Sequence, residues 1–411
     1  MSGKARILEV CNQDRFLASP YMLPFLEKLS RQGYAVEAAC RVTDAAGALR
    51  EAGVTVHDLP FTRRLTPARD LRAYRLLGEL MARGGYRLVH THTPKEGVMG
   101  RRAAWGLKVP AVLHTCNGYY FTEDSSPLRR LLVVRLEKYA ARRCHFLVFV
   151  NSEDLALALR RGMARPGRLK YVPNGVDTQR FHPGEDAGLR AELGLAPDAE
   201  VVGYVGEVTR EKNLGMLLEA CEALAADRPG LRLVLVGDAP KEPRALEELR
   251  RRAGRGSMAG KVIFAGYRRD VERFYRVFRV YAHPSLREGF GVPLIEAMAS
   301  GVPVVACRVR GPREVVRDGI TGTLVEPGDA AEMAAALSFY LEEEAAVERH
   351  TARALEDVRR NWRLADMHRR LLGIYRRLLR EAESAERKGA EGESGRPAGK
   401  HGERRGEGRR A

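Results

Sequence analysis

The chain has 411 residues, enough for two or three domains, and its 45% hydrophobic content is typical of a globular protein rather than a disordered one. A net charge of +17 first suggests nucleic-acid binding, but the sequence has no Lys/Arg run with interleaved aromatic residues. The tail 382–411 holds eight Lys/Arg against six Asp/Glu, so most of the positive charge is spread over the folded body. That distribution fits phosphorylated ligands or an acidic membrane surface at least as well.

The cysteines and the apolar runs indicate the compartment. No two cysteines form a CxxC pair and most lie in apolar runs, so we expect buried, reduced thiols at Cys11, Cys40, Cys116, Cys144, Cys221 and Cys307. No apolar run approaches ~18 residues, and no signal-like segment follows a basic N-terminus. We therefore predict a cytoplasmic protein, or a peripheral one on the cytosolic face of a membrane.

Short apolar runs alternate with amphipathic stretches from the start of the chain. The runs predicted as buried strands are Ala5–Cys11, Tyr34–Cys40, Val54–Leu59, Tyr86–Thr91, Ala111–Cys116 and Phe146–Val150. The stretches predicted as helices are Tyr21–Gln32, Pro67–Arg83, Lys95–Gly106 and Pro127–Arg143. Strand–helix alternation predicts a parallel sheet with helices on both faces.

The alternation pauses at Asp177–Ala199, which is rich in Gly, Pro and Asp, and then restarts. The second set of predicted strands is Val201–Val205, Leu231–Val236, Val262–Ala265, Val280–His283 and Val304–Ala306. We therefore predict an α/β protein of two doubly wound, Rossmann-like domains that face each other across a cleft. The predicted division is an N-terminal domain 1–180, a linker 181–198, a C-terminal domain 199–362, a helix 363–383 that crosses back to the first domain, and a disordered tail 384–411.

The predicted helix Pro127–Arg143 has two interpretations. Its leucines recur at helical spacing, and basic residues cover its other faces. We favour a packed helix with a solvated basic face. The alternative is a helix that lies on a membrane surface and guides the protein to a lipid-linked substrate.

The segment from Arg287 to Gly301 is the most informative one. Glu288 lies in a loop with Gly289 and Gly291, Pro293 suits the start of a helix, and Glu296 lies in the opening turns of that helix. The free amides of a helix N-terminus can bind phosphate, and carboxylates can accept hydrogen bonds from sugar hydroxyls. This combination indicates a sugar-nucleotide site.

Three further features follow predicted strands. Lys212, at a strand–helix turn, either neutralises phosphate in the cleft or is a solvated residue at the start of a helix. Asn174-Gly175 indicates a turn at the end of the first domain. Backbone groups at Tyr267 and Arg268 either read a nucleotide base or only begin a helix that is capped near Asp270.

Histidines raise the question of a metal site. His90 and His92 fall on one face of a predicted strand, but we expect no carboxylate partner near them. We therefore expect polar strand ends that line the cleft, and we expect His283 to be a scaffold residue rather than a catalytic base. The sequence has no DxD pair at a strand end and no His/Cys ligand cluster, so we predict no metal and no cofactor.

Together these features resemble the retaining glycosyltransferases of family 4, which have the two-domain GT-B fold. Glu288 and Glu296 are similar to the family's E-x7-E motif, and Lys212-Asn213 to its E-K-G/N turn. The other matching segments are His90–Lys95 with Gly97 and Gly100, Pro173–Asp177 with Phe181 and Pro183, Gly301–Ala306, and Gly319, Gly322, Leu324, Val325 and Pro327. The resemblance runs from about Arg6 to about Leu379 and is closest to enzymes of polysaccharides and lipid-linked sugars.

The resemblance assigns roles to the matching residues. Glu296 would bind the ribose hydroxyls of the donor nucleotide, and Glu288 the hydroxyls of the donor sugar. The amides of Gly289, Phe290 and Gly291 would hold sugar or diphosphate oxygens. Lys212 would stabilise the departing diphosphate without a metal. The resemblance favours UDP as the nucleotide of the donor.

Two positions depart from the family pattern. Glu207 stands where many members carry an arginine that clamps the diphosphate, so Arg210 is the candidate substitute. Asn117 and Tyr120 stand where relatives carry histidines, so Asn117 keeps a hydrogen-bonding group in the site but not a titratable one.

We therefore predict a retaining transfer of a hexose or N-acetylhexosamine from a nucleoside diphosphate sugar to a glycan or lipid-linked glycan, in cell-surface polysaccharide synthesis. Two alternatives stay open: a non-catalytic sugar-nucleotide-binding partner, motivated by Glu207 and Asn117, and a sugar-nucleotide epimerase of the same fold. Nucleic-acid binding would require strongly salt-dependent affinity for DNA or RNA.

Overall fold

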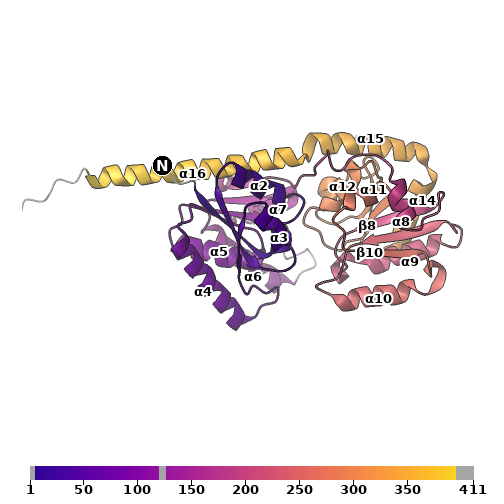
Figure 1. The fold of residues 1–411 in the computed structure, drawn as a ribbon, viewed down its shortest axis with the longest axis horizontal. Helices are drawn as coiled ribbons and strands as arrows, with labels where there is room; N and C mark the ends of the chain where they lie inside the picture. The colour runs from indigo at the N-terminus through magenta and orange to yellow at the C-terminus, as the bar shows by residue number, and fades with distance from the viewer. Residues whose placement is uncertain (1–4, 120–125, 395–411) are drawn as a thin grey trace, which may run out of the picture.

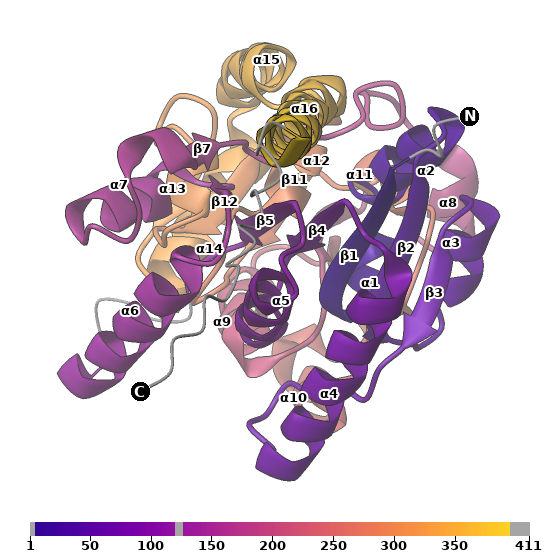
Figure 2. The same ribbon diagram turned by 90° about the vertical axis from the view of Figure 1, so that its left-hand side faces the viewer.

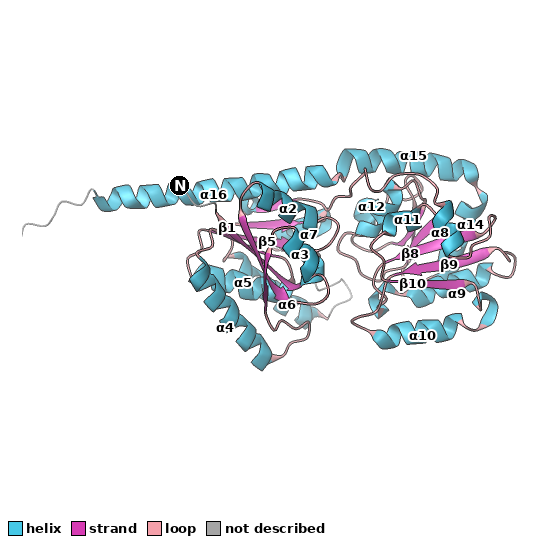
Figure 3. Cartoon of the chain, in the orientation of Figure 1, coloured by secondary structure: helices cyan, strands magenta, loops and turns pink. Residues whose placement is uncertain are grey.

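The first domain is built on a parallel sheet of seven strands (Figure 3). The structure is a computed structural model that describes residues 5–119 and 126–394. The strand order is β3-β2-β1-β4-β5-β6-β7. The strands are β1 (Arg6–Gln13), β2 (Ala35–Arg41), β3 (Thr55–Asp58), β4 (Leu88–Thr91), β5 (Ala111–Cys116), β6 (Phe146–Phe149) and β7 (Leu169–Tyr171). The chain reverses its direction of strand addition between β1 and β4, which makes that pair a topological switch point.

Helices cover both faces of this sheet because successive residues of a strand point to opposite sides. They are α1 (Asp14–Leu17), α2 (Leu23–Arg31), α3 (Ala46–Glu51), α4 (Pro67–Gly84), α5 (Pro94–Gly106), α6 (Pro127–Ala141), α7 (Ser152–Arg160) and the short η1 (Pro166–Arg168). On β1, Ile7 and Cys11 pack with α2 and α3, whereas Leu8 and Val10 pack in the core with α4, α5 and α6. Figure 2 shows α5 between α4 and α6.

The second domain repeats the arrangement with a six-stranded parallel sheet of order β10-β9-β8-β11-β12-β13. Its strands are β8 (Glu200–Val205), β9 (Leu231–Val236), β10 (Val262–Gly266), β11 (Val280–His283), β12 (Val304–Cys307) and β13 (Thr323–Val325). Its helices are α8 (Ala187–Glu192), η2 (Arg210–Lys212), α9 (Leu214–Leu224), α10 (Pro243–Ala253), η3 (Gly256–Met258), α11 (Val271–Tyr275), α12 (Val292–Ala299), α13 (Pro312–Val315), α14 (Ala330–Glu342) and α15 (Glu344–Asn361). The switch point of this sheet lies between β8 and β11.

The chain passes between the two domains twice, and the passages lie side by side. Val176 donates a backbone hydrogen bond to Trp362 and accepts one from Leu364, both at 2.9 Å. Gly175 makes this close approach possible, because a Cβ there would lie 2.7 Å from the Cα of Leu364. The last helix, α16 (Leu364–Ser394), then runs along the first domain (Figure 1), where Leu371 and Tyr375 enter its core.

The predicted fold class is confirmed, with two differences in the elements. The three-residue edge strands β7 and β13 are too short for their alternation to be recognised in the sequence. Residues 384–394, predicted as disordered, continue α16, and their Glu, Ala, Lys and Arg residues favour helix. The tail beyond Ser394 lies outside the described residues. Among the residues that the structure describes, no helix is long and apolar enough to cross a bilayer.

Candidate active site

The candidate site lies at the switch point of the second sheet. Glu207 and Lys212 follow β8, and Glu288 follows β11, the neighbouring strand. Because the carboxyl ends of parallel strands meet at one edge, these residues converge although 76 residues separate Lys212 from Glu288. Open α/β sheets bind their ligands at this kind of crevice.

Glu288 is held by two side chains. The Lys212 ammonium forms an ion pair with its carboxylate, and His283 Nε2 lies 3.1 Å from the same oxygen, Oε2. Since a carboxylate only accepts, His283 donates from Nε2, and its Nδ1 accepts from the Tyr281 hydroxyl at 3.0 Å. His283 is therefore a positioning residue for Glu288, which is more specific than the predicted scaffold role.

Electrostatics keep this carboxylate ionised. Burial opposes the charge on Glu288, but the Lys212 ammonium and the His283 hydrogen bond outweigh it, so the pKa of Glu288 lies well below its usual range. Burial lowers the pKa of His283, so its imidazole is neutral near pH 7. The arrangement offers a fixed anion and a fixed cation in the crevice, suited to a neutral sugar and an anionic phosphate respectively.

The loop after Glu288 touches the first domain. A Cβ on Gly289 would lie 2.1 Å from the carbonyl oxygen of Asn117, so only glycine allows this approach. Asn151 Nδ2 donates to the Gly289 carbonyl at 2.8 Å, and the Asn117 amide donates to the His92 carbonyl at 3.0 Å. The structure thus brings Asn117 beside the glutamate loop, as the predicted site requires, while Tyr120 lies outside the described residues.

The amides predicted to bind the donor begin α12. Gly291 precedes this helix with φ of +93°, a left-handed conformation that few other residues adopt. The helix begins at Val292, so Pro293 takes its second position rather than its first. Phe290 is buried and anchors the loop.

Glu296 lies on the buried side of α12. It is only 5% exposed and accepts a hydrogen bond of 2.9 Å from the Tyr275 hydroxyl. Burial raises the pKa of Glu296 to about 7, although the Tyr275 hydrogen bond opposes that shift. The predicted ribose ligand therefore titrates near neutrality, unlike Glu288.

Glu207 holds a second cation near the site, which the sequence analysis did not predict. Its carboxylate forms an ion pair with Lys241, which follows β9. Burial lowers the pKa of Lys241, Glu207 opposes this, and Arg63 and Lys212 lower it further. The predicted substitute, Arg210, is exposed and has no ion pair among residues 5–119 and 126–394. Sequence reasoning missed Lys241, although its position after a strand end was a usable signal.

The other two predicted contacts lie at the end of β10. Tyr267 is 58% exposed, and the Arg15 guanidinium from the first domain lies 5.6 Å from its ring centre. Arg268 forms ion pairs with Asp270 and Glu192 at 2.8 and 2.7 Å. The side chains of Tyr267 and Arg268 therefore have partners other than Lys212 and Glu288.

The expectation that His90 and His92 lack a carboxylate partner is wrong. Glu9 of β1, the strand beside β4, accepts from His92 Nε2 and from the Tyr375 hydroxyl, each at 2.6 Å. His90 bonds to Tyr375 and Thr115 at 2.6 and 2.7 Å. The possible ligand atoms of Glu9, His90 and His92 lie within 4.8 Å of one another, a spacing that suits a metal ion. The hydrogen bonds tie α16 to the strand ends beside the cleft.

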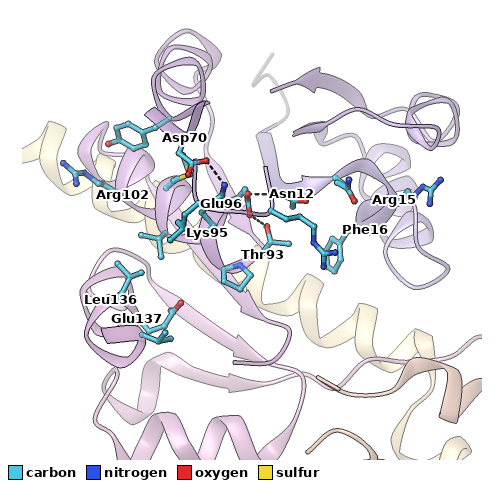
Figure 4. A pocket seen from close by; sticks show the side chains of 18 of the residues that line it. Asn12, Arg15, Phe16, Asp70, Thr93, Lys95, Glu96, Arg102, Leu136 and Glu137 are labelled. Atoms are coloured by element: carbon cyan, nitrogen blue, oxygen red, sulfur yellow. Dashed lines mark hydrogen bonds and ion pairs between the residues drawn. The ribbon is translucent and has the colours of Figure 1, made fainter. Parts of the chain in front are cut away.

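A cavity of about 1030 Å³ opens between α4 and α6. Its lining continues past the first turn of α5 to Asn12 and Phe16 near the end of β1, and to Glu207 and Lys241 in the second domain. Figure 4 shows Lys95 and Glu96 between Asp70 and Leu136, with dashed lines joining Lys95 to Asp70 and Asn12 to Glu96. The cavity thus joins the outer helices to the candidate site.

The favoured interpretation of the helix 127–143 is also wrong for its leucines. They face solvent, with exposed fractions of 67% for Leu128, 49% for Leu131, 59% for Leu132 and 49% for Leu136. α6 packs on the domain through Val134, Ala140 and Ala141 instead. These small contacts leave the wide apolar stripe uncovered.

Known protein families match both halves of the chain. A family model described as "Glycosyl transferase 4-like domain" matches residues 18–175, and one described as "Glycosyl transferases group 1" matches residues 199–343. The chain is 31% identical over 324 residues to EpsD of Bacillus subtilis, whose name assigns it to the glycosyltransferases; the match covers 76% of this chain and 82% of EpsD.

Two other similarities bear on the site. The chain is 28% identical to the UDP-Gal:alpha-D-GlcNAc-diphosphoundecaprenol alpha-1,3-galactosyltransferase of Escherichia coli, over 65% of this chain and 69% of that enzyme. The crystal structure of Anabaena HepE with UDP and glucose superposes with a TM-score of 0.77 at 21% identity, covering 90% of this chain and 98% of HepE. The chain therefore belongs to the group 1 glycosyltransferases, the retaining hexosyltransferases of family 4, and has their GT-B fold.

Proposed function

We propose that this protein transfers a hexose or N-acetylhexosamine from a UDP-sugar to a glycan or lipid-linked glycan, with retention at the anomeric carbon. The observation that carries the proposal is the Lys212–Glu288–His283 arrangement at the switch point of the second sheet, facing Asn117 of the first domain. It places one fixed cation and one fixed carboxylate where the carboxyl ends of β8 and β11 meet.

The donor would lie across the edge of the second sheet. Glu296 would accept hydrogen bonds from the ribose hydroxyls, and the backbone at Tyr267 and Arg268 would contact the base. The amides of Gly289 to Gly291 and the Lys212 ammonium would hold the diphosphate and the sugar. The crystal structures of HepE with UDP and with UDP-glucose support a UDP-sugar as the donor.

The reaction follows from these positions. An acceptor hydroxyl attacks the anomeric carbon on the face from which the diphosphate departs, and the bond from that carbon to the phosphate oxygen breaks. The departing phosphate oxygen takes the hydroxyl proton, so no protein base is needed. Lys212, with Lys241 nearby, stabilises the charge that develops on the diphosphate, while Glu288 orients the sugar. These cations provide the charge stabilisation in a route that needs no metal or cofactor.

The acceptor would approach from the first domain. The Escherichia coli relative acts on a sugar carried by diphosphoundecaprenol, which supports a lipid-linked acceptor and a place in cell-surface polysaccharide synthesis. All six cysteines are buried and unpaired, which fits a reducing compartment. We place the protein in the cytoplasm, at the inner face of the membrane.

Nucleotide release with a panel of donors and acceptors tests the proposal. The panel contains UDP-glucose, UDP-galactose, UDP-N-acetylglucosamine and GDP-mannose, each with free and lipid-linked N-acetylglucosamine. We expect UDP release that depends on the acceptor, and product of retained configuration by NMR. Glu288→Ala should abolish transfer and leave the affinity for UDP within a few-fold of wild type.

Each other outcome would indicate a different function or reject the site. UDP binding without turnover of any donor would show a non-catalytic binding partner. Conversion of the donor sugar in the absence of acceptor would show an epimerase. Normal turnover by Glu288→Ala would reject the site assignment itself.

A further inference from the structure

The cavity between α4 and α6 differs in character from the site at its inner end. Apolar side chains form much of its walls, among them Leu65 just before α4, Leu71 on α4, and Val133 and Leu136 on α6. Val98 and Met99 of α5 form the floor between them. A small-molecule site typically has about 300–1,000 Å³, and this cavity of about 1030 Å³ reaches that range with walls that suit hydrocarbon rather than sugar.

The apolar surface does not stop at the mouth of the cavity. Leu65 is 84% exposed on one side, and Leu128, Leu131 and Leu132 continue the apolar stripe of α6 on the other. Exposed leucines that gather around an opening indicate contact with an apolar phase. Basic residues accompany them: Arg135 of α6 and Arg142, just after this helix, are exposed, as expected for a helix against an anionic lipid surface.

Charged side chains also line the cavity: Arg15, Arg63, Lys95, Arg102 and Lys241, against Asp70, Glu96, Glu137 and Glu207. Arg63 and Arg102 line it, and neither forms an ion pair among the described residues. Lys241 lies at its far end, close enough to Lys212 for the two ammonium groups to repel. The cavity therefore offers apolar walls and two arginines without ion pairs, and its lining reaches Glu207 and Lys241 beside the candidate site.

We propose that this cavity binds an acceptor whose sugar is attached through a diphosphate to a long hydrocarbon chain, with the first part of that chain between α4 and α6. The inference rests on the proposed function and specifies its acceptor. The diphosphate would lie near Arg63 and Arg102, the acceptor sugar would face Glu288, and the rest of the chain would stay in a bilayer touched by the leucines of α6. A free glycan would leave the apolar walls in water.

Binding of farnesyl diphosphate, compared with inorganic diphosphate, tests the cavity by calorimetry. We expect the wild type to bind farnesyl diphosphate at least tenfold more tightly. Leu136→Glu and Leu65→Glu change exposed residues, one on each wall, and each should remove that advantage. Leu159→Glu, an exposed leucine on α7 with 44% exposure, is the matched control and should keep it. Equal affinity of the wild type for both probes, or tight binding by Leu136→Glu, would overturn the proposal.

Two further measurements separate this inference from the proposed function, and a third tests the bilayer contact. UDP affinity is measured on the same samples; if the wild type does not bind UDP, the proposed donor is wrong whatever the cavity binds. Equal kcat/KM for free N-acetylglucosamine and for N-acetylglucosamine on a polyprenyl diphosphate would reject the lipid-linked acceptor while the transferase stands. Leu132→Glu should abolish co-flotation with phosphatidylglycerol vesicles, and a wild type that does not co-float would contradict the bilayer contact.

Discussion

The two halves of the cleft prepare for their ligands in different ways. On the C-terminal side, the charged groups are already paired: Lys212 and His283 hold Glu288, and Glu207 holds Lys241. On the N-terminal side, Arg63 and Arg102 have no ion pairs within the described parts of the chain, and the leucines of α6 face solvent. The C-terminal side, which we propose binds the donor, presents paired charges, whereas the cavity that we propose binds the acceptor presents arginines without ion pairs and apolar surface.

This difference has a physical reason. A diphosphate leaving group needs charges that are fixed before the reaction, because reorienting them during the reaction would cost free energy. A hydrocarbon chain needs only area from which water is excluded, which exposed side chains can provide without fixed partners. Removal of the Lys212 ammonium should therefore act mainly on the rate, and substitutions on the apolar walls of the cavity mainly on binding.

Lys212→Met should have the largest effect and test the charge-organised side directly. Without the ammonium, the developing charge on the diphosphate loses its main partner, and kcat should fall by about 10²–10³-fold. Steady-state kinetics with the best UDP-sugar measure it. A fall confined to KM would mean that Lys212 only binds the donor.

Gly289→Ala should break the contact between the two sides. The added Cβ would overlap the Asn117 carbonyl, so the domains could not approach, and kcat/KM should fall by about 10²-fold. The melting temperature should change little, because each domain has its own core. Gly47→Ala, where no atom lies within 4 Å of the new Cβ, is the control and should behave like wild type.

Lys241→Met should show which residue supplies the second cation. We expect the affinity for the UDP-sugar to fall about tenfold, the size of a lost charge-assisted hydrogen bond. Arg210→Met should change it less than about twofold, since that side chain is exposed. The reverse order would assign the diphosphate clamp to Arg210.

Glu296→Gln should give the smallest effect, visible in the pH dependence of stability. Because burial raises the pKa of Glu296 from 4.5 to about 7, its favourable contribution is fully present below pH 4.5 and is lost as the pH rises towards 7. Glutamine does not titrate, so the melting temperature of the variant should gain on wild type by roughly a few degrees between pH 5 and pH 8. A constant difference across that range would show that Glu296 does not titrate there.

Much of the candidate active site could be predicted from the sequence. Glu288, Gly289 and Glu296 lie within nine consecutive residues, and strand–helix alternation places that segment at a sheet edge. Lys212 follows from the same rule. Short-range patterns suffice here because one turn and one helix carry most of the groups.

What the sequence by itself determined is the class of fold and the loop that carries Glu288, since both depend on local periodicity and on which residues follow a strand. Only the tertiary structure decided the partners: Lys241 is 34 residues from Glu207, and His92 is 83 residues from Glu9. Strand order brings these pairs together, and no local pattern encodes strand order. The leucines of α6 give a second example. Their helical spacing is the same whether they face a core or solvent, so the sequence pattern could not decide between the two. The domain packs on Val134 instead, which leaves the leucines exposed.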